Sequence, residues 1–238
     1  RLRIGQLRGA EPMQVVSGRL DYPKVHFEAP PRQGLEERLN AFIDWFNQSL
    51  NDSLLDPLLR AGITHLWFVT LHPFDDGNGR ITRTLTDLSL AQMDEQSIRL
   101  YAMSTAILNK RKSYYEILEQ TQKNDSDITD WLVWFLDTLN DSLEKTLAQI
   151  SRTLFKSQFW HKYSNLALSE EQRKVLNRLL DGGENGFEHG ISASQYQKVA
   201  KISKATATRH LSDLLEKECI VKLEGGGRNT RYQINTQL

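Results

Sequence analysis

Apolar residues recur every three or four positions along most of the chain from about residue 35, which is the spacing of one buried helix face. The longest such stripe runs from Ile128 to Ile150, and shorter ones precede it. The pattern stops at residues 72–79 and resumes at Ile81. The chain is therefore predicted to be mainly α-helical, with a loop between two helices at residues 72–79.

One short stretch before the helices carries a strand signal. The segment Met13-Gln14-Val15-Val16 is flanked by a proline and by a Ser-Gly pair. Such punctuation around a β-branched run is typical of one arm of a short hairpin, here spanning about residues 10–20.

The last third of the chain has a different order of predicted elements. Composition changes near residue 165, so we predict two domains, 1–165 and 166–238. In the second domain we expect three helices, at 170–180, up to Ile202 and at 204–218. Two strands around a glycine turn follow, at 220–223 and 232–234. A helix, a helix-turn-helix and a hairpin in this order predict a small α+β winged helix domain.

Composition narrows the class of protein without indicating an activity. The 238 residues carry 30 basic and 30 acidic side chains, and the zero net charge excludes a globally basic nucleic-acid-binding protein. The single cysteine, Cys219, excludes a disulfide framework and a cysteine-built zinc site, and favours a reducing, cytoplasmic compartment. No run of 18 apolar residues predicts a membrane span. The chain starts at Arg1 rather than Met, so we expect it to be a fragment of a longer protein.

The chemistry concentrates in the loop at 72–79 and the helix after it, in the run His-Pro-Phe-Asp-Asp-Gly-Asn-Gly-Arg followed by Arg83. Its two glycines permit positive φ and close backbone approach, so N–H groups of the loop and of the helix N-terminus can surround an anion. Arg80 and Arg83 share one helix face, and two guanidinium groups there suit a polyphosphate. Asp76 is placed to hold Mg²⁺ against phosphates, and His72 to take a proton from an attacking hydroxyl. The pattern predicts a phosphoryl- or nucleotidyl-transfer site. It is not a Walker A loop, because no Gly-Lys-Ser/Thr follows.

These residues resemble, position for position, the signature His-x-Phe-x-Asp/Glu-Gly-Asn-Gly-Arg-x-x-Arg of the Fic family (filamentation induced by cyclic AMP). The resemblance extends over roughly residues 1–160. It implies a helical Fic fold with a β-hairpin flap over the active site. It also implies the activity of most characterised members, which transfer AMP from ATP to a protein hydroxyl with Mg²⁺.

The resemblance further implies a role for each motif residue. His72 would be the general base for a Ser, Thr or Tyr hydroxyl of the target, Phe74 a buried anchor of the loop, and Asp76 the Mg²⁺ ligand. The residues implied at the phosphates, three in the anion hole and two arginines at the outer phosphates, are Gly77, Asn78, Gly79, Arg80 and Arg83.

Two further segments are similar to family elements. Met13, Gln14, Val15 and Val16 resemble the flap that binds the backbone of the target by strand addition. The nucleoside pocket of the family carries an Arg-x-x-Tyr-Tyr segment, and the residues implied here are Tyr114, Tyr115 and, two turns on, Gln122. No match to the family's inhibitory Ser/Thr-x-x-x-Glu-Gly/Asn helix occurs in the chain, so we expect that helix upstream and this fragment to be deregulated.

The winged helix leaves two partners open, DNA or another protein. Residues 192–231 hold a local excess of basic side chains, which suits phosphate contacts. The candidate contact residues on the recognition helix and the wing are Lys204, Thr206, Thr208, Arg209, Arg228 and Arg231.

Several functions remain open at this point. The first is a Mg²⁺-dependent protein adenylyltransferase with ATP as co-substrate. The second is a DNA-binding regulator in which the Fic domain senses a nucleotide. A Fic enzyme that moves another phosphate-containing group, or that removes AMP, is a third. Neither the target protein nor the oligomeric state follows from the sequence, and a homodimer is one option.

Overall fold

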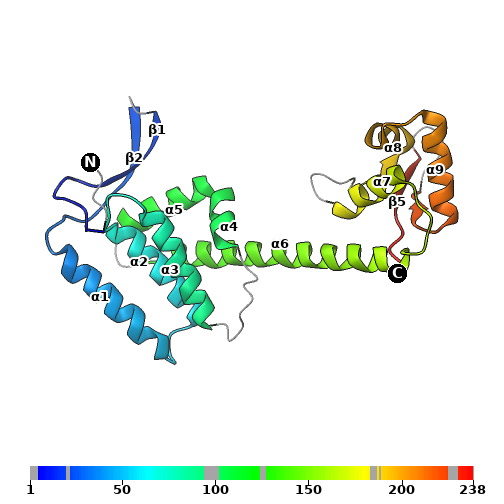
Figure 1. Ribbon diagram of the computed structural model, residues 1–238. Coiled ribbons are helices and arrows are strands. Elements are labelled where there is room, and N and C mark those ends of the chain that lie inside the picture. Colours follow the sequence, from blue (N-terminus) through cyan, green and yellow to red (C-terminus); the bar gives the residue numbers. More distant parts are fainter. Residues whose placement is uncertain are drawn as a thin grey trace. The chain divides into compact units, whose positions relative to one another are not determined.

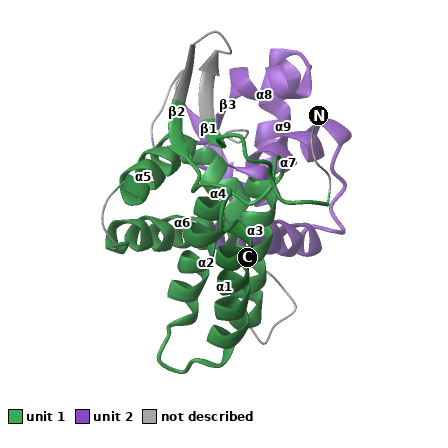
Figure 2. Ribbon diagram, turned by 90° about the vertical axis from the view of Figure 1, so that its left-hand side faces the viewer, with its two compact units in different colours: residues 1–146 green, residues 147–238 purple. Residues whose placement is uncertain are grey.

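The computed structural model describes residues 5–19, 22–93, 102–123, 127–182, 187, 189–224 and 230–237, with the backbone alone at 16–19 and 22–24 (Figure 1). The chain forms two compact units, residues 1–146 and 147–238, coloured separately in Figure 2. The units meet inside one long helix, α6 (Thr129–Lys162). The domain boundary predicted at 165/166 falls just after the end of this helix and stays a prediction.

The first unit consists of a hairpin and a bundle of helices. The hairpin strands are antiparallel, and their register shifts once, between Val15 and Val16. The elements of this unit before α6 are β1 (Gln14–Arg19), β2 (Tyr22–Glu28), α1 (Leu35–Gln48), the 3₁₀ turn η1 (Ser49–Asn51), α2 (Pro57–Leu71), α3 (Asn78–Met93), α4 (Met103–Asn109) and α5 (Arg111–Lys123). The mainly helical prediction is confirmed. The predicted strand at 13–16 overlaps β1, although Met13 precedes it, but the hairpin predicted at about 10–20 extends to Glu28, because its second strand, β2, was not predicted.

Helix α2 is the centre of this bundle and is buried along most of its length. It runs beside α3 in Figure 1 and contacts α1 on another side. Gly62 lets α6 come close, because a Cβ there would lie 2.9 Å from Cδ2 of Leu132. The indole Nε1 of Trp131 donates to the Gly62 carbonyl at 2.9 Å. The packing therefore fixes α2, and with it the loop that begins at its C-terminal end.

The second unit is built around α7 (Glu170–Asp181), α8 (Ala193–Ala200) and α9 (Lys204–Glu216). Reciprocal Ser/Gln capping boxes begin α7 and α8, and Ser203 caps α9 through the Thr206 N–H. Three short antiparallel strands in the order β3-β5-β4 complete the unit: β3 (Ile191–Ser192), β4 (Ile220–Lys222) and β5 (Arg231–Ile234). The predicted helices and the last two strands are confirmed, whereas β3 is too short to leave a period in the sequence.

Arg228 and the glycine turn predicted before it lie outside the described residues. Within the described part of the chain, no helix is both long and apolar enough to cross a bilayer.

Candidate active site

A cavity of about 170 Å³ lies where the C-terminal end of α2, the first turns of α3, helix α5 and the hairpin meet. It brings together residues that the sequence predicted from three separate segments: Val15, His72, Gly79, Arg83, Tyr114, Tyr115 and Gln122. Five residues that the sequence did not single out as functional complete the wall: His26, Phe27, Val69, Leu118 and Glu119.

His72 ends α2 in the left-handed conformation, with φ 45° and ψ 58°. Its Nδ1 lies 3.1 Å from the Val69 carbonyl oxygen, which only accepts, so Nδ1 carries the proton and Nε2 keeps its lone pair. Burial lowers the pKa of the His72 imidazole below its ordinary value, and the nearby Arg8 charge acts in the same direction. The ring is therefore neutral near pH 7 and able to accept a proton at Nε2.

Arg8, which no sequence pattern singled out, fixes the backbone of the loop that begins at His72. The side chain is 2% exposed, its Nε donates to the His72 carbonyl at 2.9 Å, and its Nη2 donates to the Pro30 carbonyl. Its backbone N–H donates to the Pro73 carbonyl at 2.9 Å. An arginine 64 positions away along the chain therefore fixes the peptide that carries His72.

The turn into α3 differs in detail from the expectation. Gly77 has a φ of +88°, as predicted, but Gly79 lies in the first turn of α3 with helical geometry. Gly79 matters for space instead, because a Cβ there would lie 3.3 Å from Nη1 of Arg83. Asn78 is 2% exposed, and its side-chain amide bonds both the N–H and the C=O of Phe74 at 3.0 and 2.7 Å. This amide shapes the loop, while the first N–H groups of α3 have no partner within the helix.

The charged motif residues lie at two depths. Arg83 lines the cavity, whereas Asp76 and Arg80 are exposed and pair with each other, Oδ2 to Nη2, at 2.9 Å. Phe74 is half-buried and packs near Phe68, with ring centroids 6.4 Å apart. The motif thus presents one guanidinium inside the cavity and a carboxylate–guanidinium pair at the surface beside it.

A buried hydrogen-bond chain fixes Tyr114. The Thr86 hydroxyl donates to the Thr82 carbonyl, so His65 Nδ1 donates to Thr86, and the Tyr114 hydroxyl donates to His65 Nε2 at 2.9 Å. Burial lowers the pKa of His65 to about 3 and raises that of the Tyr114 phenol, so both groups are neutral at pH 7. Tyr114 thus belongs to the core and to the cavity wall at once.

Gln122 lies at the far end of α5, where its Nε2 donates to the Thr70 hydroxyl at 2.9 Å. Its Oε1 is buried and has no hydrogen-bond partner among the residues that the structure describes. A buried acceptor at the edge of a cavity is costly unless a ligand supplies a donor.

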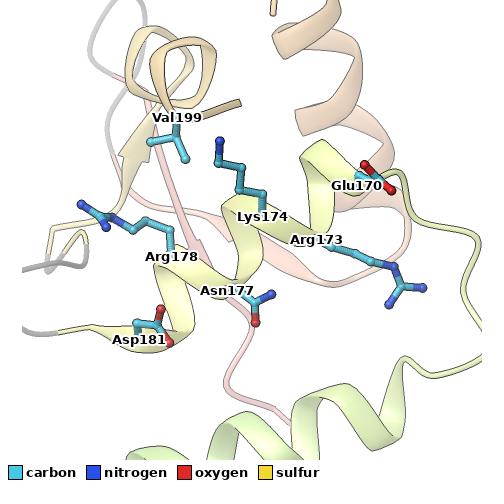
Figure 3. A pocket seen from close by; sticks show the side chains of 7 residues that line it. All are labelled: Glu170, Arg173, Lys174, Asn177, Arg178, Asp181 and Val199. Atoms are coloured by element: carbon cyan, nitrogen blue, oxygen red, sulfur yellow. The ribbon is translucent and has the colours of Figure 1, made fainter. Parts of the chain in front are cut away.

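A larger cavity, about 660 Å³, lies in the second unit and holds none of the motif residues. Figure 3 shows that the charged ends of α7 side chains surround it, with Val199 of α8 above. Asp181 in its wall pairs with Lys156 at 2.6 Å. Its lining is that of a solvated, mostly basic helix face and not of an enclosed reaction site.

Comparison with known proteins agrees with the motif. Residues 3–90 match the model of the Fic/DOC family. The match covers less than half of the chain and indicates a Fic/DOC family domain in this part of it. The matched part contains the hairpin, Arg8 and the loop at 72–83, and it ends before α5.

Curated relatives of the Fic domain carry an activity in their names. "Protein adenylyltransferase Fic" of Nematostella vectensis is 32% identical over 117 residues, which is 49% of this chain and 26% of the relative. "Protein adenylyltransferase fic-1" of Caenorhabditis elegans is 35% identical over 85 residues, 34% of this chain and 16% of the relative. The matches thus span about a quarter or less of the relatives' own length.

A solved structure is similar over nearly the whole chain. The Fic family protein from Desulfovibrio desulfuricans G20 aligns with a TM-score of 0.50 and 20% identity, covering 97% of this chain and 62% of that chain. At this identity the similarity concerns the fold alone.

Proposed function

We propose that the protein transfers AMP from ATP to a Ser, Thr or Tyr hydroxyl of a target protein, in a Mg²⁺-dependent reaction. The observation that carries this proposal is the single cavity that holds the His72 imidazole, the first turn of α3 with Arg83, and the Tyr114–Tyr115 pair beside the hairpin. The adenylyltransferase names of the relatives support the same reaction class.

In this reaction the oxygen of the target hydroxyl attacks the α-phosphorus of ATP. A new P–O bond forms, the bond to the β-phosphate oxygen breaks, and pyrophosphate leaves. His72 accepts the hydroxyl proton at Nε2, since Nδ1–H is held by the Val69 carbonyl. Charge spreads over the phosphate oxygens, so positioning and electrostatic stabilisation contribute most of the acceleration.

The α3 end of the cavity suits the triphosphate. The N–H groups of Gly77, Asn78 and Gly79 would receive the phosphate oxygens, and Arg83 would neutralise them from inside the cavity, with Arg80 joining from the surface.

Mg²⁺ commonly binds through one carboxylate plus substrate phosphates, and the exposed Asp76 supplies one carboxylate beside this turn. Among the described residues no group of three acidic, His or Cys side chains lies together, so this mode fits better than a cage built by the protein alone. Bound there, the ion would neutralise charge on the phosphates.

The nucleoside and the target fit the remaining walls. Tyr114, Tyr115 and Gln122 would enclose the nucleoside, and the unpartnered Gln122 Oε1 would accept from one of its donors. The backbone of the target protein would add as a strand to the hairpin, along the flap residues Met13, Gln14, Val15 and Val16. In the described hairpin β1 pairs with β2 alone, which leaves its other edge without a strand partner.

The test is intact-mass spectrometry of the chain after incubation with Mg²⁺ and each of the four nucleoside triphosphates, with and without candidate target proteins. We expect a mass gain of AMP with ATP. A gain of a different phosphate-containing group, or loss of AMP from a modified target, would replace this reaction with one of the other Fic-type reactions. No change under any condition would contradict the proposal.

The acidic side of the pH–rate profile should reflect His72. Because the pKa of His72 lies below the ordinary histidine value of 6.5, the ring is still neutral at that pH. It becomes protonated only at lower pH. We therefore expect kcat/KM to hold between pH 8 and about 6.5 and to fall at lower pH, where the base is lost. A midpoint above pH 7 would contradict this assignment, and circular dichroism across the same range checks that the fold persists.

We also propose that the second unit is a winged helix that binds duplex DNA through the outer face of α9. Lys204, Thr208 and Arg209 are exposed there, and residues 204–212 contain no acidic side chain. The first acid on the helix, Asp213, is held by Lys217 and Gln172. Such a face suits phosphate contacts from a helix in the major groove. Fewer residues are available for DNA contact than the sequence predicted. Thr206 is bonded to the N-cap Ser203 through its backbone N–H and its hydroxyl, and Arg231 donates to the Gly190 carbonyl.

Fluorescence anisotropy with random-sequence duplex DNA at low and moderate salt tests this second function. The Lys204→Ala/Arg209→Ala variant should bind more weakly and reduce the salt slope by about 2, since two phosphate contacts are lost. A matched control removes two exposed cations from α7, Lys174→Ala/Arg178→Ala (both labelled in Figure 3), and should leave binding near that of the parent. Absence of binding at low salt would reject DNA as the partner and leave a protein surface.

A further inference from the structure

The hairpin beside the active-site cavity carries a β-bulge whose extra residue is His26. Val15 pairs with Phe27, but the next residue of β1, Val16, pairs with Val25, so His26 has no counterpart across the hairpin. In a regular strand, adjacent side chains point to opposite faces. Here the adjacent His26 and Phe27 both line the cavity, while Val25 is 43% exposed. The bulge therefore turns His26 to the cavity side, as bulges next to active sites commonly re-aim a side chain.

The re-aimed imidazole contacts α5. Its ring stacks on Tyr115 with centroids 5.0 Å apart and planes 19° apart. Its Nδ1 lies 3.7 Å from Oε2 of Glu119, which is one turn further along the same helix. A hairpin residue thus contacts the helix that carries the tyrosines of the candidate nucleoside pocket.

The hairpin needs such a contact to keep its place. An isolated two-stranded hairpin is marginally stable in water, so packing against the helices decides where it stays. An aromatic pair in offset or near-parallel contact adds stability beyond the area it buries. Val15 and Phe27 also line the cavity where the hairpin meets the helices, but they are apolar and make non-directional contacts.

We propose that His26 is a positioning residue. Its stack on Tyr115 holds the hairpin in one position over the cavity, so that β1, the strand proposed to bind the target, lies at a fixed place relative to His72. The placement of the hairpin stands on the contacts above. That this placement serves target binding rests on the proposed function.

Hydrogen exchange of the full-length chain, followed by mass spectrometry of peptides within residues 13–28, tests the placement without any enzymatic assay. In His26→Ala the amides of β1 and β2 should exchange about tenfold faster, as expected for loss of one aromatic pair. His26→Phe keeps a ring on Tyr115 but loses the contact with Glu119, and should restore slow exchange. Val25→Ala, the exposed neighbour on the other face, is the matched control and should exchange like the parent.

Equal exchange in His26→Ala and the parent would overturn the proposal. Fast exchange in both His26→Ala and His26→Phe would also overturn it, because the ring stack would then not be what holds the hairpin. If the parent shows no transfer activity but its hairpin exchange still depends on the ring at position 26, the proposed function fails and the positioning role stands.

Kinetics provide the second readout once a target is known. His26→Ala should raise the KM for the protein target about tenfold with little change in kcat, and His26→Phe should restore it. A lowered kcat at unchanged KM would place His26 in the chemical step and contradict a positioning role.

Discussion

The His72→Ala variant should lose AMP transfer by about 10²–10⁴-fold while still binding ATP. The imidazole lines the cavity, and its Nε2 lone pair is free to accept a proton because the Val69 carbonyl holds the proton at Nδ1. The phosphate end of the cavity, at Gly79 and Arg83, does not depend on it. Single-turnover transfer rates and calorimetric ATP binding measure the two effects separately.

The backbone at His72 requires a second variant as control. Its φ of 45° lies in the left-handed region, where alanine costs about 1 kcal/mol and asparagine is tolerated better. His72→Asn should therefore keep the thermal stability of the parent more closely than His72→Ala and lose as much activity. If His72→Asn retained more than a tenth of the parent rate, His72 would not be the base.

Local residue types were sufficient to predict the loop at 72–79 and the helix after it. Local contacts shape much of the loop, because Gly77 supplies the positive φ, the helix supplies its first N–H groups, and Asn78 bonds Phe74 four residues away. The positions of several helices and of the first hairpin strand followed from the period of apolar residues and from the flanking Pro, Ser and Gly for the same reason. What depends on neighbours within about four residues was readable from the sequence.

The parts that the sequence did not reveal depend on distant contacts. His65 lies within an apolar helix, and its partner Tyr114 is 49 positions away. His26 becomes a cavity residue through a bulge, which shifts the side-chain alternation by one and leaves no signal in composition. Arg8 lies in an irregular segment without any period, and the carbonyl that it binds is 64 positions away. Only the folded chain brings these groups to the site.

Arg8→Ala should reduce kcat about 100-fold, the scale expected when a catalytic group is displaced by an ångström or so. The variant removes the donors to the His72 and Pro30 carbonyls from a side chain that is 2% exposed. The loss of these hydrogen bonds and of a buried side chain should also lower the free energy of unfolding by about 2–4 kcal/mol. Arg8→Lys should recover little, because an ammonium group cannot donate in two fixed directions as the planar guanidinium does.

A double-variant cycle separates the effect on His72 from general loss of structure, with all rates measured at a temperature where every variant is folded. If Arg8 acts by positioning the His72 peptide, Arg8→Ala should lower the rate in the parent background and hardly at all in the His72→Asn background, because the positioned group is already absent. Equal losses in both backgrounds would mean that Arg8 acts elsewhere, on the phosphate end or on the hairpin that its neighbour Pro30 follows. The KM for ATP distinguishes these, since the positioning role leaves it near the parent value and a disturbed phosphate site raises it.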